Sequence, residues 1–202
     1  MIAEGRGAKR RKYGQMDFLE TGKALYLTKF KNVKYMRMAL DACTVILLAK
    51  AGVLEDLVKA HTTFIPEGAY KEVVEGKKDM LADALITERL VGERLLEVVK
   101  SKDTKMLQKL EGDFGLGKGE SETINIYFEK KLDAVATDNR QGRKTAKIHA
   151  IPLLGSPEII VHLFKVGKID RAKALLALKS LEEFGWFDGY LLEKAKDDLM
   201  GK

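Results

Sequence analysis

The chain lacks the residues on which several protein classes depend. Its 202 residues include one cysteine, Cys43, so an internal disulfide cannot form and nothing indicates an oxidising compartment. No apolar run reaches the roughly 20 residues that a bilayer-spanning helix needs, and the N-terminus has no apolar core of a signal peptide. We therefore expect a soluble, cytoplasmic protein with no membrane partner.

Histidine is almost as scarce as cysteine. His61, His149 and His162 have no metal-ligand spacing to one another or to Cys43, which argues against a zinc site. The sequence also has no serine–histidine or cysteine–histidine pattern for a nucleophilic mechanism. A phosphatase is disfavoured as well, because no Asp-x-Asp pair follows the first expected strand.

Charged residues are plentiful but unevenly placed. They make up 33% of the chain, and such high charge with few Asn, Gln and Cys is typical of proteins from thermophiles. The net charge is +6, yet residues 1–40 alone hold 10 Lys and Arg against 3 Asp and Glu. We expect residues 1–35 to form a basic extension of a domain at 36–202. The extension is either an arm that screens phosphates, or a disordered leader or sequence upstream of a start at Met36 or Met38.

Short apolar stretches alternate with helix-like segments along the rest of the chain. Strands are expected at 35–42, 62–65 and 133–137, with a further short apolar stretch at 151–154. Helices are expected at about 44–51, 54–58, 66–75, 79–99, 121–131, 140–148, 157–166, 169–184 and 190–199. This alternation predicts one α/β domain in three layers, with helices on both faces of a central parallel sheet.

Two aspartates each follow an expected strand. Asp41 ends the first strand and Asp138 follows the strand at 133–137. Ligands of open parallel sheets bind beyond the carboxyl ends of the strands, so two acids at that edge indicate a site. For either aspartate alone the alternative is a helix N-cap, because each precedes an expected helix.

The helix expected at 121–131 adds a third candidate. At about 100° per residue, Glu120 falls on the stripe of Ile124, which should pack on the sheet, whereas Glu122 falls on the polar side with Asn125. A carboxylate on a buried stripe is unfavourable unless something pairs with it. We therefore predict a functional Glu120, and a Glu122 that is either solvated or a helper behind the metal ligands.

Carboxylates that converge in one pocket repel one another and require a cation. Oxygen ligands suit Mg²⁺ or Mn²⁺ better than zinc. We expect Asp41, Glu120 and Asp138 to bind such a metal. Glu72, at the edge of the apolar stripe of the helix at 66–75, is a weaker fourth candidate, because a surface glutamate would give the same pattern.

Four stretches resemble, in order, the motifs of the PIN domain family, most closely its compact prokaryotic members. They are ALDACTVILLAKAG, FIPEGAYKEVVEG, GLGKGESETINIYFEKK and AVATDNRQGRKTAK. Each motif is weak alone, whereas four in this order across about residues 36–200 form a specific signal. The resemblance implies a PIN-like fold, and it implies catalytic roles for Asp41, Glu72, Glu120 and Asp138.

The C-terminal part, from IPLLGSPEIIVHLFKVGKI onward, resembles a subgroup with extra helices after the core. Many members of that subgroup look like VapC-like toxins of toxin–antitoxin pairs. By resemblance we expect a Mg²⁺- or Mn²⁺-dependent endoribonuclease, a cognate antitoxin protein and a homodimer. The alternatives are a processing nuclease for ribosomal or transfer RNA, a flap-type DNA endonuclease, and an inactive module that binds RNA or a partner.

Two positions depart from the family pattern. Cys43 stands where the family usually has Ser or Thr, and a thiol is a weaker hydrogen-bond partner, so either Thr44 assists the metal site in its place or the site is looser. Asn139 stands where a second acid often follows Asp138, and it would bind metal or orient water with one charge fewer. The following helix carries cations that either hold an RNA backbone or form a solvated basic face. These cations are Arg140, Arg143, Lys144 and Lys147.

Overall fold

The computed structural model describes residues 30, 33–75, 82–185, 187 and 189–201. Within these ranges five strands form one sheet in the order β3-β2-β1-β4-β5. The strands are β1 (Arg37–Leu40), β2 (Thr62–Pro66), β3 (Leu96–Val99), β4 (Ala134–Ala136) and β5 (Leu153–Leu154). Every neighbouring pair is parallel, so all the carboxyl ends lie at one edge of the sheet.

The side chains of the strands alternate between two buried faces, as the pleat of a strand requires. Ala39 and Val135 pack toward α7, whereas Met38 and Leu40 belong to the larger core on the other face. Apolar residues occupy both faces of the central strands because both faces are covered by helices. The predicted α/β class, with a central parallel sheet between two helical layers, is confirmed.

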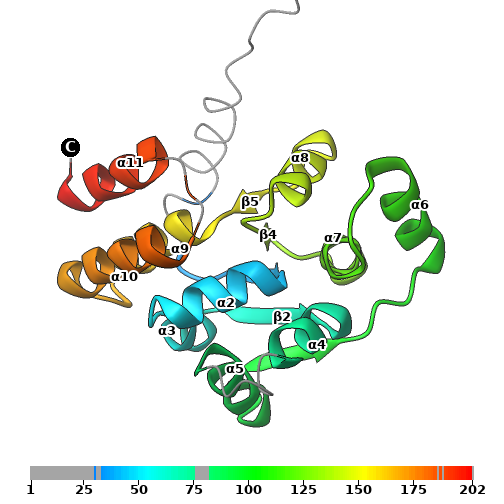
Figure 1. The fold of residues 1–202 in the computed structure, drawn as a ribbon, viewed down its shortest axis with the longest axis horizontal. Helices are drawn as coiled ribbons and strands as arrows, with labels where there is room; N and C mark the ends of the chain where they lie inside the picture. Colours follow the sequence, from blue (N-terminus) through cyan, green and yellow to red (C-terminus); the bar gives the residue numbers. More distant parts are fainter. Residues whose placement is uncertain (1–29, 31–32, 76–81, 186, 188, 202) are drawn as a thin grey trace, which may run out of the picture.

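The helices divide between the two faces (Figure 1). One face is covered by α7 (Lys118–Lys130) and α8 (Arg140–Ile148), with α6 (Thr104–Phe114) packed against α7. The other face carries α2 (Ala42–Lys50), α3 (Leu54–Ala60), α5 (Ala82–Gly92) and α9 (Ser156–Lys165). The helix α4 (Glu67–Glu75) contacts both α5 and α7, while α10 (Arg171–Phe184) and α11 (Gly189–Met200) pack on α9.

The single helix predicted at 79–99 was wrong over its last third. Helix α5 ends at Gly92, and Leu96–Val99 form β3, the edge strand beside β2. Arg94 has a φ of 60°, and Leu95 donates its N–H to the carbonyl of Leu90 at 3.0 Å. This left-handed residue with a bond back to the last turn is a helix-ending motif that usually contains glycine. Because arginine occupies this position, the glycine that usually marks such a helix end is absent from it. Residues 79–81 of the predicted helix lie outside the described residues.

Two further boundaries differ from expectation. Pro66 is the last residue of β2 rather than the first residue of a helix, and α4 begins at Glu67. The polar stretch before the predicted third motif contains α6, which the sequence analysis did not identify. Asp103 caps its first turn and Gly115, with a φ of 61°, ends it, so its signals were in the caps rather than in apolar spacing.

Most of the predicted basic extension at 1–35 lies outside the described residues. Of the part that is described, Phe30 is buried in the larger core, and the Tyr35 hydroxyl hydrogen-bonds to that of Thr62. Met36 donates its N–H to Nδ1 of the buried His61 at 3.2 Å. Throughout the described ranges, every helix is too short or too polar to cross a membrane.

Candidate functional site

Asp41 lies directly beyond β1, at the carboxyl edge of the sheet. Its side chain caps α2, because Oδ1 accepts a hydrogen bond from Thr44 N at 2.7 Å. The residue is only 3% exposed, and its buried Oδ2 has no hydrogen bond of normal geometry among the described residues. Burial raises the pKa of Asp41 to about 7, the nearby Thr137 hydroxyl and the Thr44 N–H oppose the rise, and the charge of Asp138 adds to it. The N-cap alternative therefore accounts for one oxygen of this carboxylate and not for the other.

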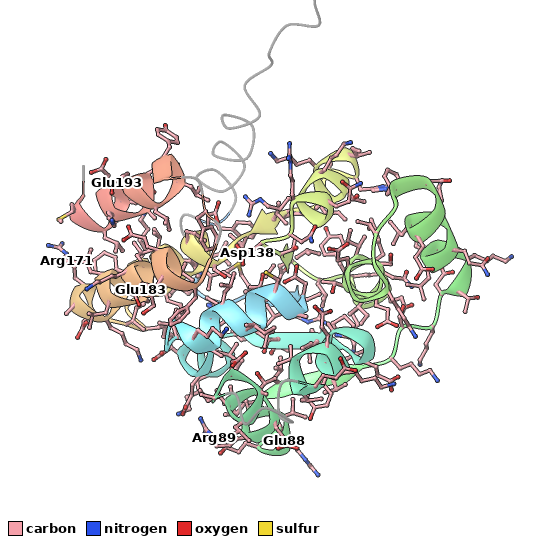
Figure 2. All side chains as sticks on the ribbon, viewed as in Figure 1. Glu88, Arg89, Asp138, Arg171, Glu183 and Glu193 are labelled. Carbon is pink, nitrogen blue, oxygen red and sulfur yellow. The ribbon has the colours of Figure 1, made fainter. Side chains whose placement is uncertain are left out.

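Asp138 follows the neighbouring strand β4 and lies near the middle of the molecule (Figure 2). Its Oδ1 accepts from Ser156 N at 2.8 Å, and its Oδ2 accepts from Ser156 Oγ at 2.5 Å and from Thr44 Oγ1 at 2.9 Å. Burial raises the pKa of Asp138, and the bonds from Ser156 oppose the rise. Thr44 thus contacts Asp41 through its N–H and Asp138 through its hydroxyl.

Glu120 comes from the opposite helical layer. It lies half-buried in the first turn of α7, where Oε2 accepts from Gly117 N at 3.0 Å. Asp41 and Glu120 line the same small cavity of about 10 Å³, together with Thr123 and Thr137. The first and third predicted acids are therefore brought together from β1 and α7.

All four predicted acids act on the thiol of Cys43. The pKa of this exposed cysteine is raised to about 12, first by partial desolvation and then by nearby carboxylates. In decreasing order of effect these are Asp41, Asp138, Glu72 and Glu120. The charges of all four carboxylates therefore reach the first turn of α2, where Cys43 lies. Glu72 is the exposed member of the group, on the outer side of α4.

The donor set of this group fits a hard divalent cation. A buried carboxylate oxygen without a hydrogen bond of normal geometry, such as Oδ2 of Asp41, is stabilised by a positive charge, and carboxylates are the ligands that Mg²⁺ and Mn²⁺ prefer. Among the described residues no three acidic, histidine or cysteine side chains already enclose an ion. A bound cation would therefore complete its ligands with water or with rotated side chains, and Glu120 and Glu72 are exposed enough to rotate.

Asn139 is turned toward its own helix. Its Oδ1 accepts hydrogen bonds from Gln141 N at 2.7 Å and Gly142 N at 3.1 Å, which makes it the N-cap of α8. An amide oxygen used in this way is occupied by the first turn of the helix. The side chain in the place of the family's frequent extra acid thus stabilises α8.

Glu122 was expected on the polar side of its helix. The prediction that it is solvated is wrong. The residue is 7% exposed, and its Oε2 accepts from Gly68 N at 2.8 Å. Asn125, on the same side, is buried as well, whereas Phe128, four residues after Ile124, is exposed. Helix α7 packs against α4 and α6 as well as against the sheet, so its polar side faces other helices and not water.

The four cations of α8 line a surface hollow of about 680 Å³ with Gln141. The guanidinium of Arg143 makes two contacts within the protein. Its Nη1 donates to Thr137 O at 3.3 Å, and its Nη2 lies 3.4 Å from Oε1 of Glu158. Arg140, Lys144 and Lys147 are exposed on the outer side of the helix. The hollow therefore presents positive charge beginning two residues after Asp138.

The sequence analysis missed Ser156, which contacts Asp138 twice. The signal was available, because Ser156 is followed by Pro157 directly after the last apolar stretch, and that pattern marks the start of a helix. A helix that starts at the carboxyl end of β5 begins at the same sheet edge as the acids. The position after a strand therefore indicates a site residue for Ser156 as it does for the two aspartates.

A parallel sheet in the order β3-β2-β1-β4-β5 between two helical layers, with acids gathered at its carboxyl edge, defines a nuclease-type α/β domain. A family model described as a PIN domain matches residues 37–193, and the chain belongs to the PIN domain family. PIN domains are in general metal-dependent nucleases that act on RNA. Comparison with curated proteins and with solved structures gave no match.

Proposed function

We propose that the protein is a metal-dependent endoribonuclease that hydrolyses RNA phosphodiester bonds at the carboxyl edge of its sheet. The observation that supports this most directly is the buried Oδ2 of Asp41, which has no hydrogen bond of normal geometry among the described residues, together with the nearby charge of a second, partly buried acid, Asp138. Asp41, Glu120 and Asp138 would hold Mg²⁺ or Mn²⁺, and Glu72 would bind the metal or position water.

Each residue has a distinct part in this proposal. When bound, the metal makes water a better nucleophile and stabilises charge on the leaving oxygen. Thr44 and Ser156 hold the carboxylates of Asp41 and Asp138 in fixed positions, and a bound cation would favour the charged form of both acids. Glu72 is exposed and can accept a proton from a water that approaches from solvent. The cations of α8 are placed to hold the phosphates that flank the cleaved bond.

A toxin role in a toxin–antitoxin pair extends the proposal. It is motivated by the resemblance of the C-terminal helices, which in this chain are α9, α10 and α11, and by the frequency of antitoxin partners among PIN nucleases. A homodimer and a cytoplasmic location belong to the same proposal. Co-expression with the product of the adjacent reading frame tests it: relief of growth arrest and co-purification are expected of a cognate antitoxin.

The second candidate is a PIN module that binds RNA or a partner without cleaving. It is favoured by Asn139, which removes one acid from the family pattern and whose oxygen caps α8. This module would bind Mg²⁺ weakly, and its RNA binding would not depend on Asp41.

Cleavage of a mixed single-stranded RNA pool separates the two candidates. The purified protein is assayed with Mg²⁺, with Mn²⁺ and with chelator, beside Asp41→Asn and the control Asp197→Asn on the exposed side of α11. The nuclease proposal expects metal-dependent cleavage that is lost in Asp41→Asn and kept in Asp197→Asn. Equal inactivity of all three proteins with both metals, together with retained RNA binding, would establish the binding module.

A further inference from the structure

The carboxylate of Asp138 is held almost entirely by one residue of another element. Ser156, the first residue of α9, donates both its N–H and its hydroxyl to Asp138, and Thr44 supplies the third bond. Ser156 is 0% exposed, so its hydroxyl makes this bond without competition from bulk water. A hydrogen bond to a charged acceptor in such a setting is among the stronger ones in proteins.

The bonds are distributed unequally over the two oxygens. A carboxylate has about four acceptor positions, two on each oxygen. Oδ2 of Asp138 accepts from Ser156 Oγ and Thr44 Oγ1, which fills it, whereas among the described residues Oδ1 accepts only from Ser156 N. One acceptor position on Oδ1 is left for a further partner. On Asp41 the oxygen left over is Oδ2, since Oδ1 caps α2.

The turn between β5 and α9 is shaped to allow this contact. A Cβ atom on Gly155 would lie 2.9 Å from Oδ1 of Asp138, 2.5 Å from Nη1 of Arg143 and 2.7 Å from Oε2 of Glu158. Any side chain at this position would press on the acid or on the Arg143–Glu158 pair beside it. Glycine therefore lets the first turn of α9 approach the carboxylate closely enough for Ser156 to bind it from two atoms.

We infer that Ser156 is a positioning residue of the metal site: its two hydrogen bonds fix the orientation in which the Asp138 carboxylate is presented to a divalent cation. This inference rests on the proposed function, because it assigns Asp138 to the metal. It also makes the start of α9 part of the site, although the helix carries none of the four predicted acids. Removal of such a hydrogen-bond partner typically weakens metal binding or activity about 10–100-fold.

The test compares Ser156→Ala with Ser121→Ala in the full chain. Both serines are 0% exposed, and both variants lose one buried hydroxyl, but the Ser121 hydroxyl has no hydrogen-bond partner among the described residues. Mn²⁺ binding is measured by calorimetry under conditions where urea unfolding shows each variant to be fully folded. We expect Ser156→Ala to weaken Mn²⁺ binding about 10–100-fold and Ser121→Ala to leave it unchanged. If Ser156→Ala does not fold, Ser156→Cys, whose thiol is a weak donor, replaces it with the same expectation.

The outcomes separate this inference from the proposed function. Wild-type Mn²⁺ affinity in a folded Ser156→Ala overturns the inference alone, even if the variant is less stable, because a purely structural serine would behave in that way. A wild type that binds Mn²⁺ but cleaves no RNA overturns the proposed nuclease and leaves the comparison of affinities decisive for Ser156. A wild type that binds no Mn²⁺ overturns both.

Discussion

The Glu122 carboxylate on α7 accepts a hydrogen bond from the backbone N–H of Gly68 at 2.8 Å. Gly68 lies in the first turn of α4, where N–H groups have no partner within their own helix. A negative charge at that end of a helix also interacts favourably with the helix dipole. Glu122 therefore caps α4 from a neighbouring helix, and a Cβ on Gly68 would lie 2.6 Å from its Oε2.

Replacement of Glu122 by alanine should destabilise the protein. The change leaves the Gly68 N–H without its partner and opens space in a buried contact, which together lower the free energy of unfolding by about 2 kcal/mol. Glu122→Gln, which keeps an acceptor oxygen, should lose less than half of that. Urea unfolding measures both, with Glu111→Ala on the exposed side of α6 as the control. A loss no larger for Glu122→Ala than for Glu111→Ala would show that the cap contributes nothing to stability.

The same contact explains where sequence reasoning failed. A helical wheel assumes one buried stripe, whereas α7 contacts the sheet, α4 and α6, so the polar residues Glu122 and Asn125 are buried against other helices. Asn125 donates to Ser101 Oγ and to the carbonyl of Asp103, and so ties α7 to the chain before α6. Hydrogen bonds between residues so distant in sequence cannot be predicted from the apolar periodicity of one helix.

The acids were accessible to prediction for a different reason. Asp41 and Asp138 follow strands that are parallel neighbours, and parallel order alone brings strand ends together. β3 was missed because its helix-ending signal sits on Arg94, a residue without a strong turn preference. Ser156 was missed because a serine before proline has a sufficient local explanation as a helix start, and only the packed structure shows that it reaches Asp138.

Asp41→Asn should stabilise the metal-free protein while it removes metal binding. Asparagine keeps the cap on α2 and does not have to bury a charge. Because burial raises the pKa of Asp41 to about 7, the folded state binds more protons than the unfolded state between about pH 4 and pH 7. The wild type therefore loses stability from this group as pH rises through that window, and the penalty is complete above pH 7.

Thermal unfolding at pH 8 with chelator tests this expectation. The Tm of Asp41→Asn should exceed that of the wild type by several degrees, at about 2–4 °C per kcal/mol for a chain of this size. Addition of Mg²⁺ should raise the Tm of the wild type and not that of the variant. Asp197→Asn should match the wild type in both conditions. A variant less stable than the wild type in chelator would contradict the assignment of Asp41 as a strained, buried acid.

Two buried histidines, His61 and His162, should make stability fall as pH falls, which is opposite to the effect of Asp41. His61 and His162 are buried with ring centroids 5.2 Å apart. Burial is the first cause that lowers each pKa to about 4, and the positive charges of Lys168 near His61 and Lys165 near His162 contribute. The unfolded state binds more protons than the folded state between about pH 6.5 and pH 4, so stability falls as pH falls through this window.

The effect is measured as a difference, because Asp41 titrates in the same range with the opposite sign. In the Asp41→Asn background, the unfolding free energy should fall from pH 6.5 to pH 4.5 by at most about 1.4 kcal/mol per pH unit for each histidine. His162→Phe, which keeps a ring, should flatten this slope. An equal slope with and without His162 would mean that the imidazole is protonated freely in the folded protein.

The thiol of Cys43 offers a reporter of the acids that needs no RNA. It is the only cysteine in the chain, so its alkylation can be followed without background. With its pKa raised to about 12, Cys43 should react with iodoacetamide at pH 8 roughly a thousandfold more slowly than a free cysteine, because the thiolate is the nucleophile. Unfolding in urea should restore the ordinary rate.

Amide substitutions in the folded protein should then rank the four acids. Each removes one negative charge near the sulfur and should speed alkylation in chelator. The acceleration should be largest for Asp41→Asn, smaller for Asp138→Asn and Glu72→Gln, and smallest for Glu120→Gln, which is the order of their effects on the Cys43 pKa. Desolvation remains in every variant, so none should reach the rate measured in urea. If an amide at Glu72 changed the rate no more than Asp197→Asn does, Glu72 would stand apart from the other acids, and the proposed group would be reduced to three.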